Sequence, residues 1–404
     1  MAAMEKNNKT LNVPHLRFPE FSGEWGMASI AECFSLYSGN TPSRTQKDNF
    51  VGELNWISSG ELKTHYLDYT GEHISLKVAH ENNLRILPVG TFVIAIYGLE
   101  AEGVRGTGSI ITKESTISQA CMAFLPKGPI TSEFLYAWYK KHGNLIGIKY
   151  AQGTKQQNLG YDIVEKLQLR FPSIAEQKKL ELFISLIDQR IETQKKIIED
   201  LKKLKDAICN LNFTSGSSLT LGDIGYFVRG LTYSASDVID DTAGTAVMRS
   251  NNISNGDPVN FEELVWVNKT PNHEQILRDG DILICMANGS SPLVGKASYY
   301  VDCGMYSATV GAFCGIYRSY NPLTKWLFQS KHYKKHIQRC IQGGNGAIAN
   351  IYSEDILAIS FNIPSGYERV LNTLNSLEDK YLLEQKLLCR YLTVKSHLLA
   401  QLFI

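Results

Sequence analysis

The sequence predicts an α+β protein with two pseudo-symmetric domains, each holding a mixed β-sheet, and two long helices that pair as an antiparallel coiled coil. Three observations predict this fold class. Apolar residues recur in alternating steps of four and three over residues 177–213 and 367–404. The second set follows the first at a constant offset of 190 residues, as Val370 follows Leu180. Strand-like segments and a helix precede each set in the same order.

The predicted organisation is a domain and a long helix, repeated once across a linker. Repeat units of solenoid proteins span about 20–50 residues, so the longer offset indicates a duplicated domain. The linker is rich in Ser and Gly, a composition typical of flexible segments. The expected parts are a tail and strap at 1–24, a first domain at 25–176, a first spacer helix at 177–213, the linker at 214–218, a second domain at 219–366 and a second spacer helix at 367–404.

Segments rich in β-branched and aromatic residues, bounded by Gly, Pro or polar residues, predict the strands. They are 54–58, 84–97, 108–111, 119–125 and 166–171 in the first domain, and 246–249, 281–286, 297–301, 309–317 and 356–363 in the second. Each domain is also expected to contain a helix, at 131–142 and at 323–341. Thr131 or Ser132 can cap the first of these, with Glu133 in its first turn.

Both long helices have predicted starts. Ser173 and Glu176 fit the Ser-x-x-Glu pattern of a capping box before the first helix. Ser365 and Glu368 repeat the pattern before the second helix, where we expect Gly366 to weaken the first turn.

The seam between the long helices is predicted position by position. The first helix contributes Leu180, Ile184, Ile187, Ile191, Gln194, Ile198, Leu201, Lys205 and Ile208, and the second contributes Val370, Leu374, Leu377, Tyr381, Glu384, Leu388, Tyr391, Lys395 and Leu398. Partner numbers have a constant sum in an antiparallel pair, so Gln194 is expected to face Glu384 near the middle. A central polar pair can fix register at a cost in stability. The alternative is that both side chains point to solvent at a local break in the seam.

Composition limits the possible locations and chemistry. The formal net charge of 404 residues is +1, and no predicted domain is strongly basic, which counts against a DNA-binding protein that acts without partner subunits. The eight cysteines form no CxxC pair, so we expect reduced thiols and no zinc or redox site. The first ten residues are polar and no run of about 18 apolar residues occurs. We therefore expect a cytoplasmic protein without a membrane segment.

Motifs of catalysis are missing from the sequence. Residues 289–297, GSSPLVGKA, have the wrong glycine spacing for a phosphate-binding loop and are expected to form a turn before a strand. His65 and His73 have no ligand spacing and are expected in a solvated loop, and Glu378 is expected to be a solvated charge. There is no GxSxG or HExxH motif and no Asn/Asp-Pro-Pro-Tyr/Phe motif of adenine methyltransferases. The sequence favours recognition over catalysis.

Two amide-rich loops occupy matching places in the two domains. Their candidate DNA-contacting residues are Lys155, Gln156, Gln157 and Asn158 in the first domain, and Asn345 and Asn350 in the second. Gln and Asn can pair bidentately with adenine, and Lys can reach guanine or phosphate. Further candidates are the cluster Arg249, Asn251 and Asn252, and the basic residues Lys331, Lys334 and Lys335 of a helix that could follow phosphates. The alternative is polar surface loops and a solvated helix face.

Four segments resemble one protein family. They are LRFPEFSGEW (16–25), NWISSGEL (55–62), QGTKQQN (152–158) and FPSIAEQKKL (171–180). Together with the repeated order of domain and long helix, they resemble the specificity (S) subunit of type I restriction-modification systems. The resemblance covers nearly the whole chain, although the sequence PSGYE (364–368) departs from the family's usual start of a spacer helix.

The resemblance implies a function and partners. The two domains would be target-recognition domains, each reading one half of a bipartite site in double-stranded DNA, and the helices would fix the gap between the half-sites. Two methyltransferase (modification) subunits and the motor-nuclease (restriction) subunits would bind. The subunit itself would be non-catalytic and without cofactor, because S-adenosylmethionine, ATP and Mg would belong to the partners. Two alternatives are a coiled-coil scaffold with two protein-binding domains and a single-chain restriction or modification enzyme.

Overall fold

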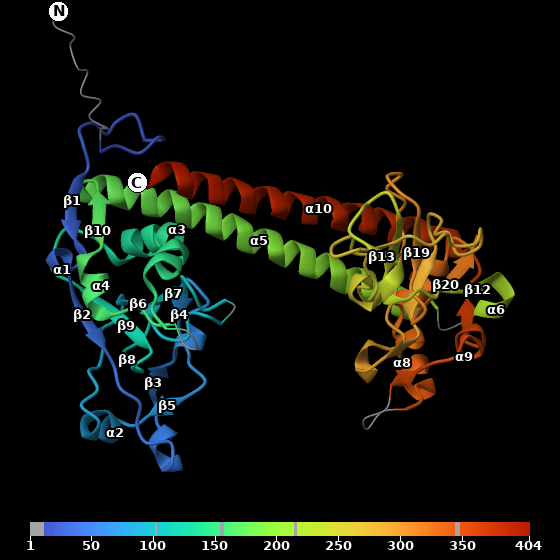
Figure 1. Ribbon diagram of the computed structural model, residues 1–404, viewed down its shortest axis with the longest axis horizontal. Helices are drawn as coiled ribbons and strands as arrows, with labels where there is room; N and C mark the ends of the chain where they lie inside the picture. The colour runs from blue at the N-terminus through green and yellow to red at the C-terminus, as the bar shows by residue number, and fades with distance from the viewer. Residues whose placement is uncertain (1–11, 102, 154–156, 214–215, 344–347) are drawn as a thin grey trace, which may run out of the picture. The chain divides into compact units, whose positions relative to one another are not determined.

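The computed structural model describes residues 12–101, 103–153, 157–213, 216–343 and 348–404 (Figure 1). The chain divides into two compact units, residues 1–193 with 387–404 and residues 194–386. Each unit therefore contains one globular domain and a part of each long helix.

A five-stranded mixed sheet of order β2-β9-β6-β7-β4 forms the centre of the first unit (Figure 1). The β4–β7 pair is parallel and the other pairs are antiparallel. A second sheet has the order β5-β3-β8, and β1 pairs with β10. The strands are β1 (Gly26–Ser29), β2 (Phe34–Ser38), β3 (Leu54–Ile57), β4 (Tyr66–Leu67), β5 (His73–Ile74), β6 (Phe92–Ala95), β7 (Gly108–Ile111), β8 (Ser115–Ile117), β9 (Cys121–Pro126) and β10 (Gln168–Phe171).

One helix of the first unit, α3, packs against the central sheet. The helices are α1 (Ile30–Cys33), α2 (Leu76–Glu81), α3 (Ser132–Tyr150) and α4 (Tyr161–Lys166). Thr131 caps α3 as predicted, because its hydroxyl accepts a hydrogen bond from the Phe134 N–H (3.1 Å). The core between helix and sheet contains Phe134 and the ring pair of Phe92 and Phe124, whose centroids are 5.5 Å apart.

Three local predictions for the first unit need correction. The helix predicted at 131–142 continues to Tyr150, since Ile146 keeps it packed on the core. The strand predicted at 84–97 is limited to Phe92–Ala95, because a turn at Pro88–Thr91, with Gly90 at a φ of +85°, precedes it. His65 is not in a solvated loop: its ring stacks on Tyr136 with centroids 3.9 Å apart, and its Nε2 lies 2.8 Å from the Glu133 carboxylate.

The second unit contains two four-stranded sheets. The sheet of order β12-β20-β16-β18 is antiparallel, whereas the sheet of order β13-β15-β14-β19 is mixed because β14 and β19 are parallel. Two short pairs, β11 with β22 and β17 with β21, complete the unit. The strands are β11 (Ser217–Thr220), β12 (Gly225–Arg229), β13 (Val238–Ile239), β14 (Thr245–Met248), β15 (Val265–Val267), β16 (Ile282–Cys285), β17 (Ala287–Asn288), β18 (Ala297–Tyr299), β19 (Ala308–Val310), β20 (Cys314–Ser319), β21 (Ala349–Asn350) and β22 (Ser360–Ile363).

The predicted single helix at 323–341 is wrong. Ser330 is extended (φ −66°, ψ 153°) and caps a new helix by accepting a hydrogen bond from the Tyr333 N–H (3.2 Å). The helices of this unit are α6 (Leu221–Ile224), α7 (Thr324–Gln329), α8 (Lys331–Cys340) and α9 (Ser353–Leu357). The strand predicted at 309–317 is likewise split into β19 and β20, and the one at 356–363 is limited to β22. Residues 289–297 do form a turn before β18, as predicted.

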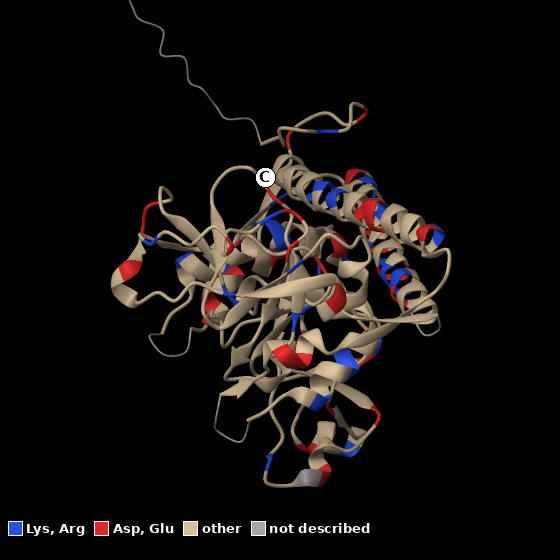
Figure 2. Ribbon diagram, turned by 90° about the vertical axis from the view of Figure 1, so that its right-hand side faces the viewer, with Lys and Arg blue, Asp and Glu red and all other residues tan. Residues whose placement is uncertain are grey.

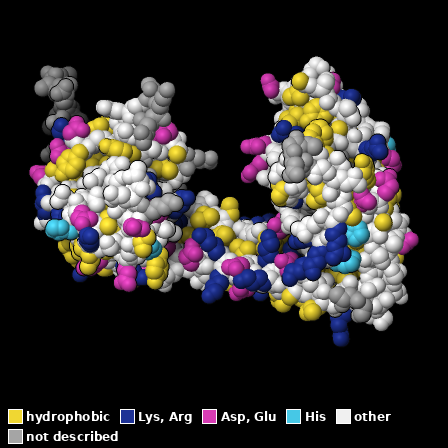
Figure 3. Space-filling view, turned by 90° about the horizontal axis from the view of Figure 1, so that it is seen from below, with side chains coloured by type: hydrophobic (Ala, Val, Ile, Leu, Met, Phe, Trp, Pro, Cys, Tyr) yellow, Lys and Arg dark blue, Asp and Glu magenta, His cyan; other side chains and the backbone are white. Residues whose placement is uncertain are grey.

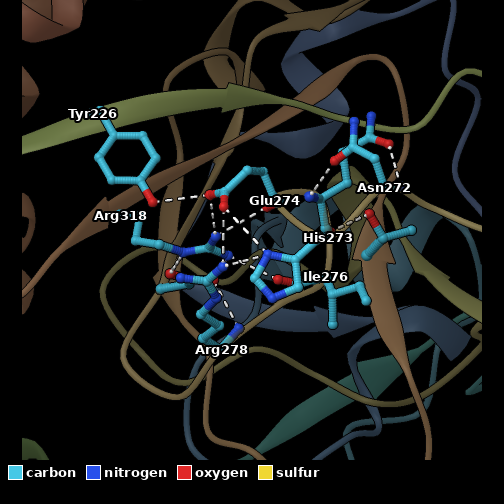
Figure 4. A network of polar contacts seen from close by, with 10 residues as sticks. Tyr226, Asn272, His273, Glu274, Ile276, Arg278 and Arg318 are labelled. Carbon is cyan, nitrogen blue, oxygen red and sulfur yellow. Dashed lines mark hydrogen bonds and ion pairs between the residues drawn. The ribbon is translucent and has the colours of Figure 1, made fainter.

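A network of polar contacts around Arg318 fixes one loop of the second unit (Figure 4). The Arg318 guanidinium donates to both carboxylate oxygens of Asp281 at 2.8 and 2.6 Å, and each side chain is only 3% exposed. The same guanidinium donates to the backbone carbonyls of Glu274 and Ile276. The hydrogen bonds to the Asp281 carboxylate raise the pKa of Arg318 further above its usual value. The segment from Asn272 to Arg278 is therefore anchored on β20.

The two long helices are α5 (Ile174–Asn212) and α10 (Tyr367–Leu402). Only half of the predicted capping box at the start of α5 forms: the Glu176 N–H donates to Ser173 Oγ (3.4 Å), but the Glu176 carboxylate binds Arg17 at 2.8 and 2.7 Å instead. Gly366 lies before α10 with a φ of +72°, so it does not weaken the first turn as predicted. No helix among the described residues is long and apolar enough to cross a membrane.

The units share their order of elements. In each, a short strand leads into a one-turn helix that begins with a capping box, Ser29 with Glu32 in α1 and Thr220 with Asp223 in α6. The first strand pairs with the last strand of the same domain, β1 with β10 and β11 with β22, and a long helix follows. This order agrees with the repeat inferred from the sequence.

Candidate nucleic-acid interface

The amide-rich loops have equivalent stems in the two units. Gln152 and Asn158 exchange backbone hydrogen bonds of 2.9 and 2.8 Å, and Gln342 and Asn350 exchange two of 2.9 Å. The residue after each Gln is a glycine in the left-handed region, with a φ of +118° at Gly153. The stems of the two loops therefore share one pattern of backbone hydrogen bonds.

The loop candidates differ in what their side chains contact. Lys155, Gln156 and Asn345 lie outside the described residues. The side-chain oxygens of Asn158 and Asn350 are both buried and have no hydrogen-bond partner within the described part of the chain. A buried acceptor without a donor costs free energy, so a bound group that offers an N–H or O–H would be favoured there.

Gln157 is held by two residues that the sequence did not single out. Its Oε1 accepts a hydrogen bond from Arg105 Nη2 (2.7 Å), and its backbone N–H donates to Glu100 Oε2 (2.7 Å). This backbone hydrogen bond is the main cause that lowers the pKa of Glu100. Arg105 lies far from the loop in sequence, and only the fold brings it to the same surface.

The cluster around Arg249 needs one correction. Asn252 is fully buried, and its amide bonds the Arg249 N–H (2.9 Å) and the carbonyls of Asn260 (3.0 Å) and Glu262 (2.7 Å). Its side chain therefore holds the loop together. The prediction that Asn252 contacts DNA is wrong. Arg249 and Asn251 are exposed, and their contacts to Glu263 are long, at 3.4 and 3.5 Å.

Helix α8 presents its basic residues away from the core. Tyr333 and Ile337, four residues apart, are buried, whereas Lys331 and Lys335 are exposed and Lys334 is half-buried. Figure 3 shows a group of basic side chains beside histidines on the face of the second unit that it presents. The arrangement suits contact with phosphates, although charge of both signs covers other elements, including the long helices (Figure 2).

All the predicted seam positions of α5 and α10 are buried or half-buried. In the second unit Gln194 is fully buried, and its amide donates to the backbone carbonyl (3.2 Å) and the carboxylate of Glu384. In the first unit Arg190 Nε donates to the Tyr391 hydroxyl (3.0 Å). The helices run antiparallel within each unit, because Gln194 contacts Glu384 and Lys205 contacts Glu378 in the second unit, while Arg190 contacts Tyr391 and Asp188 contacts Lys395 in the first.

Two ion pairs accompany the seam at equivalent places. In the second unit Lys205 Nζ donates to Glu378 Oε2 (2.7 Å), with 3% and 2% of these side chains exposed. In the first unit Lys395 pairs with Asp188, with 25% and 26% exposed. Lys395 follows Lys205 by 190 residues, and Glu378 follows Asp188 by the same offset. Glu378 is therefore not the solvated charge that the sequence predicted.

The end of α10 is anchored in the first unit. Lys141 Nζ donates to the carbonyls of Ala400 (2.9 Å) and Phe403 (2.6 Å), and His142 Nε2 lies 3.2 Å from the Ile404 carbonyl. Burial lowers the pKa of His142 to about 4, so a neutral imidazole faces this carbonyl. In the second unit the N–H of Lys331, the counterpart of Lys141, donates to Asn210 near the end of α5 (2.8 Å).

Comparisons with known proteins agree with this architecture. Residues 22–203 match the model of the type I restriction modification DNA specificity domain. The specificity subunit of the type I restriction enzyme MjaIX from Methanocaldococcus jannaschii is 27% identical over 185 residues, and that of MjaVIII is 22% identical over 367 residues. The chain is similar to type I restriction-modification specificity subunits. The matches span 45% of this chain and 42% of the MjaIX subunit, and 84% of this chain and 81% of the MjaVIII subunit.

Solved structures from type I restriction-modification systems show the same fold. The S subunit of a type I restriction-modification system from M. genitalium has a TM-score of 0.54 at 16% identity, covering 97% of this chain and 99% of that one. A chain from a structural study of complex assembly and conformational transition in the type I R-M system has a TM-score of 0.55 at 12% identity, covering 93% and 96%. The predicted α+β class and the family resemblance are confirmed.

Proposed function

We propose that the chain is the DNA-recognition subunit of a type I restriction-modification complex. Each domain reads one half of a bipartite site in double-stranded DNA, and the chain itself performs no catalysis. S-adenosylmethionine, ATP and Mg²⁺ then act on the partner subunits. The observation that carries the proposal is the repetition of one fold with different loop side chains, in a chain related to specificity subunits. A scaffold with two protein-binding domains would have no reason to place amide-rich loops at the same point of both units.

The partners follow from the same proposal. Methyltransferase subunits, two in number for a pseudo-symmetric chain, dock on the outer faces of α5 and α10, and motor-nuclease subunits join them for restriction. Exposed apolar side chains on these helices, such as Leu182, Leu186 and Leu383, support a docking role because the helices do not need them for their own seam. Phosphate contacts shared with such partners fit the net charge of only +1.

Exchanging the second domain, residues 219–366, for that of a relative is expected to change one half-site and to leave the other unchanged. The physical reason is that each domain has its own core and its own loops, so its base contacts move with it. The bound sequences are selected from a randomised duplex library with the methyltransferase subunits present. A change of both half-sites, or of neither, would contradict one domain per half-site.

A four-residue insertion after Gln194 is expected to lengthen the gap between the half-sites. The first domain precedes α5 and the second follows it, and four residues add about one helical turn, or about 6 Å. Both half-site sequences should stay the same, since the insertion touches neither domain. The matched control inserts four residues between Phe213 and Gly216, after the end of α5 and before β11. A protein that folds and binds with an unchanged gap would refute the spacing role.

A further inference from the structure

A cleft of about 420 Å³ opens at one edge of the second unit. Strands β14 and β19 are parallel, so their carboxyl ends meet at this edge, and the cleft lies among the residues that follow them. Six of the residues lining it are Tyr233, Arg249, Ser250, Asn288, Phe313 and Cys314. Its wall thus combines two aromatic rings with a guanidinium, an amide and a hydroxyl, a mixture that suits a flat, polar-edged ligand such as a nucleobase.

The polar side chains of the cleft differ in how far their hydrogen-bonding groups are already used within the protein. Asn288 is held in place, because its Oδ1 accepts from the Ser290 N–H (2.9 Å) and its Nδ2 donates to Ser250 Oγ (3.2 Å). Within the described part of the chain, the Arg249 guanidinium makes only the long contact to the Glu263 carbonyl, at 3.4 Å, and the residue is exposed. A guanidinium has five N–H donors, so a pair of parallel donors remains for a ligand. Phe313, which lines the same cleft, is 64% exposed.

The same backbone frame exists in the first unit. The Gly311 N–H donates to the Met248 carbonyl (2.9 Å), and the Ser118 N–H donates to the Ile57 carbonyl (2.9 Å). The Phe313 carbonyl accepts the Met286 N–H (2.8 Å), just as the Ala120 carbonyl accepts the Ile96 N–H (2.9 Å). These matching hydrogen bonds identify equivalent residues in the two domains independently of sequence identity. Gly311 corresponds to Ser118, and Phe313 corresponds to Ala120.

On this shared frame the side chains at the cleft are replaced. Arg249 follows the end of β14 as Ser58 follows the end of β3, and Phe313 corresponds to Ala120. Asn288 follows Ala287 as Gly98 follows Tyr97. At the equivalent positions the first unit therefore carries neither the guanidinium of Arg249 nor the ring of Phe313, while Tyr97, 36% exposed, takes the position of Ala287. The two domains thus share a backbone arrangement but differ in the side chains at the cleft. Such a difference would allow one fold to read two different DNA sequences.

We propose that this cleft is a base-recognition site of the second domain, in which Arg249 donates two hydrogen bonds to O6 and N7 of a guanine and Phe313 packs against the adjoining base. The proposal deepens the DNA-recognition function and rests on it. Arg paired with guanine through two parallel hydrogen bonds is the commonest specific contact in the major groove. Because the first unit carries Ser58 and Ala120 instead, the guanine requirement belongs to the second half-site alone.

The test uses the full chain with its methyltransferase subunits and duplexes randomised in both half-sites. The unaltered protein should select a guanine at one position of the second half-site. Arg249→Ala should reduce that preference by about 5- to 150-fold and leave the first half-site unchanged. Arg249→Lys should keep affinity but lose most of the preference, because an ammonium is a point charge without the planar fork. Arg170→Ala, an exposed arginine on β10 of the first unit, is the matched control and should change neither half-site.

Each outcome decides a separate question. An unchanged second half-site in Arg249→Ala overturns the cleft as a base-recognition site. A uniform loss of affinity for all sequences in Arg249→Ala shows a phosphate contact and also overturns it. If the unaltered complex selects no sequence at all, the DNA-recognition function itself is refuted. Thermal unfolding of each variant checks that the second domain is folded. We expect it to be folded, because Arg249 is exposed and its replacement removes no core contact.

Discussion

Replacing Lys205 by methionine is expected to lower the free energy of unfolding of the second unit by about 3–5 kcal/mol. Lys205 and Glu378 form an ion pair that is almost fully buried, and the Tyr299 hydroxyl donates to the same carboxylate. The Lys205 ammonium also lies 4.8 Å from the Tyr381 ring centroid. Methionine would fill the space but leave the Glu378 carboxylate buried without a countercharge, which is the costly part of the change. Chemical denaturation of the full chain, followed by hydrogen exchange of each unit, measures the loss.

The chain supplies its own control for this change. Lys395→Met breaks the equivalent ion pair with Asp188. In this pair the Lys395 side chain is 25% exposed and the Asp188 side chain is 26% exposed. Water solvates the remaining carboxylate there, so the expected loss is about 1 kcal/mol or less. A double variant, Lys205→Met with Glu378→Leu, should recover most of the stability, since no charge is left buried. Equal losses for Lys205→Met and Lys395→Met would show that burial does not set the cost.

The helix seam was predictable because its information is local. A four-three period fixes which residues share a stripe, and the second copy repeats it at a constant offset, so the polar places at Gln194 and Lys205 could be seen in advance. The burial of Glu378 could not. It lies beside the stripe, and only the fold brings Tyr299 over it. The periodicity of apolar residues predicts which positions face a partner helix. It does not predict whether a domain covers the positions beside the seam, such as Glu378.

The candidate site was predictable only as a region. Polar loops at equivalent places can be found by overlaying the two copies, which is how Arg249 was found. The same overlay could not separate Arg249, which is exposed, from Asn252, which is buried and holds its own loop together. Asn suits both roles equally, and the choice depends on carbonyls eight and ten residues away. Phe313 and Arg105 were missed because neither belongs to an amide-rich segment.

Replacing Arg318 by leucine is the second change with a large expected effect, a loss of about 3–5 kcal/mol in the free energy of unfolding of the second unit. Asp281 would remain buried without its countercharge, and the carbonyls of Glu274 and Ile276 would lose their donor (Figure 4). The same segment is tied to β19 through the Gln275 carbonyl, which accepts from the Thr309 hydroxyl (2.7 Å). Since β19 leads into the turn that carries Phe313, selection at the second half-site should weaken together with stability.

The first unit shows how the controls should be built. Thr91 precedes β6 as Asp281 precedes β16, and Leu125 occupies the place of Arg318 in the matching strand, so the first unit has no ion pair there. The double variant Asp281→Thr with Arg318→Leu copies that arrangement and is expected to recover most of the stability lost in Arg318→Leu, because both charges are gone. Arg278→Ala, which removes a partly exposed partner of Glu274, should cost about 1 kcal/mol or less. Denaturation curves decide the matter: a double variant as unstable as Arg318→Leu would mean that lost packing, and not the unpaired Asp281 carboxylate, causes the loss.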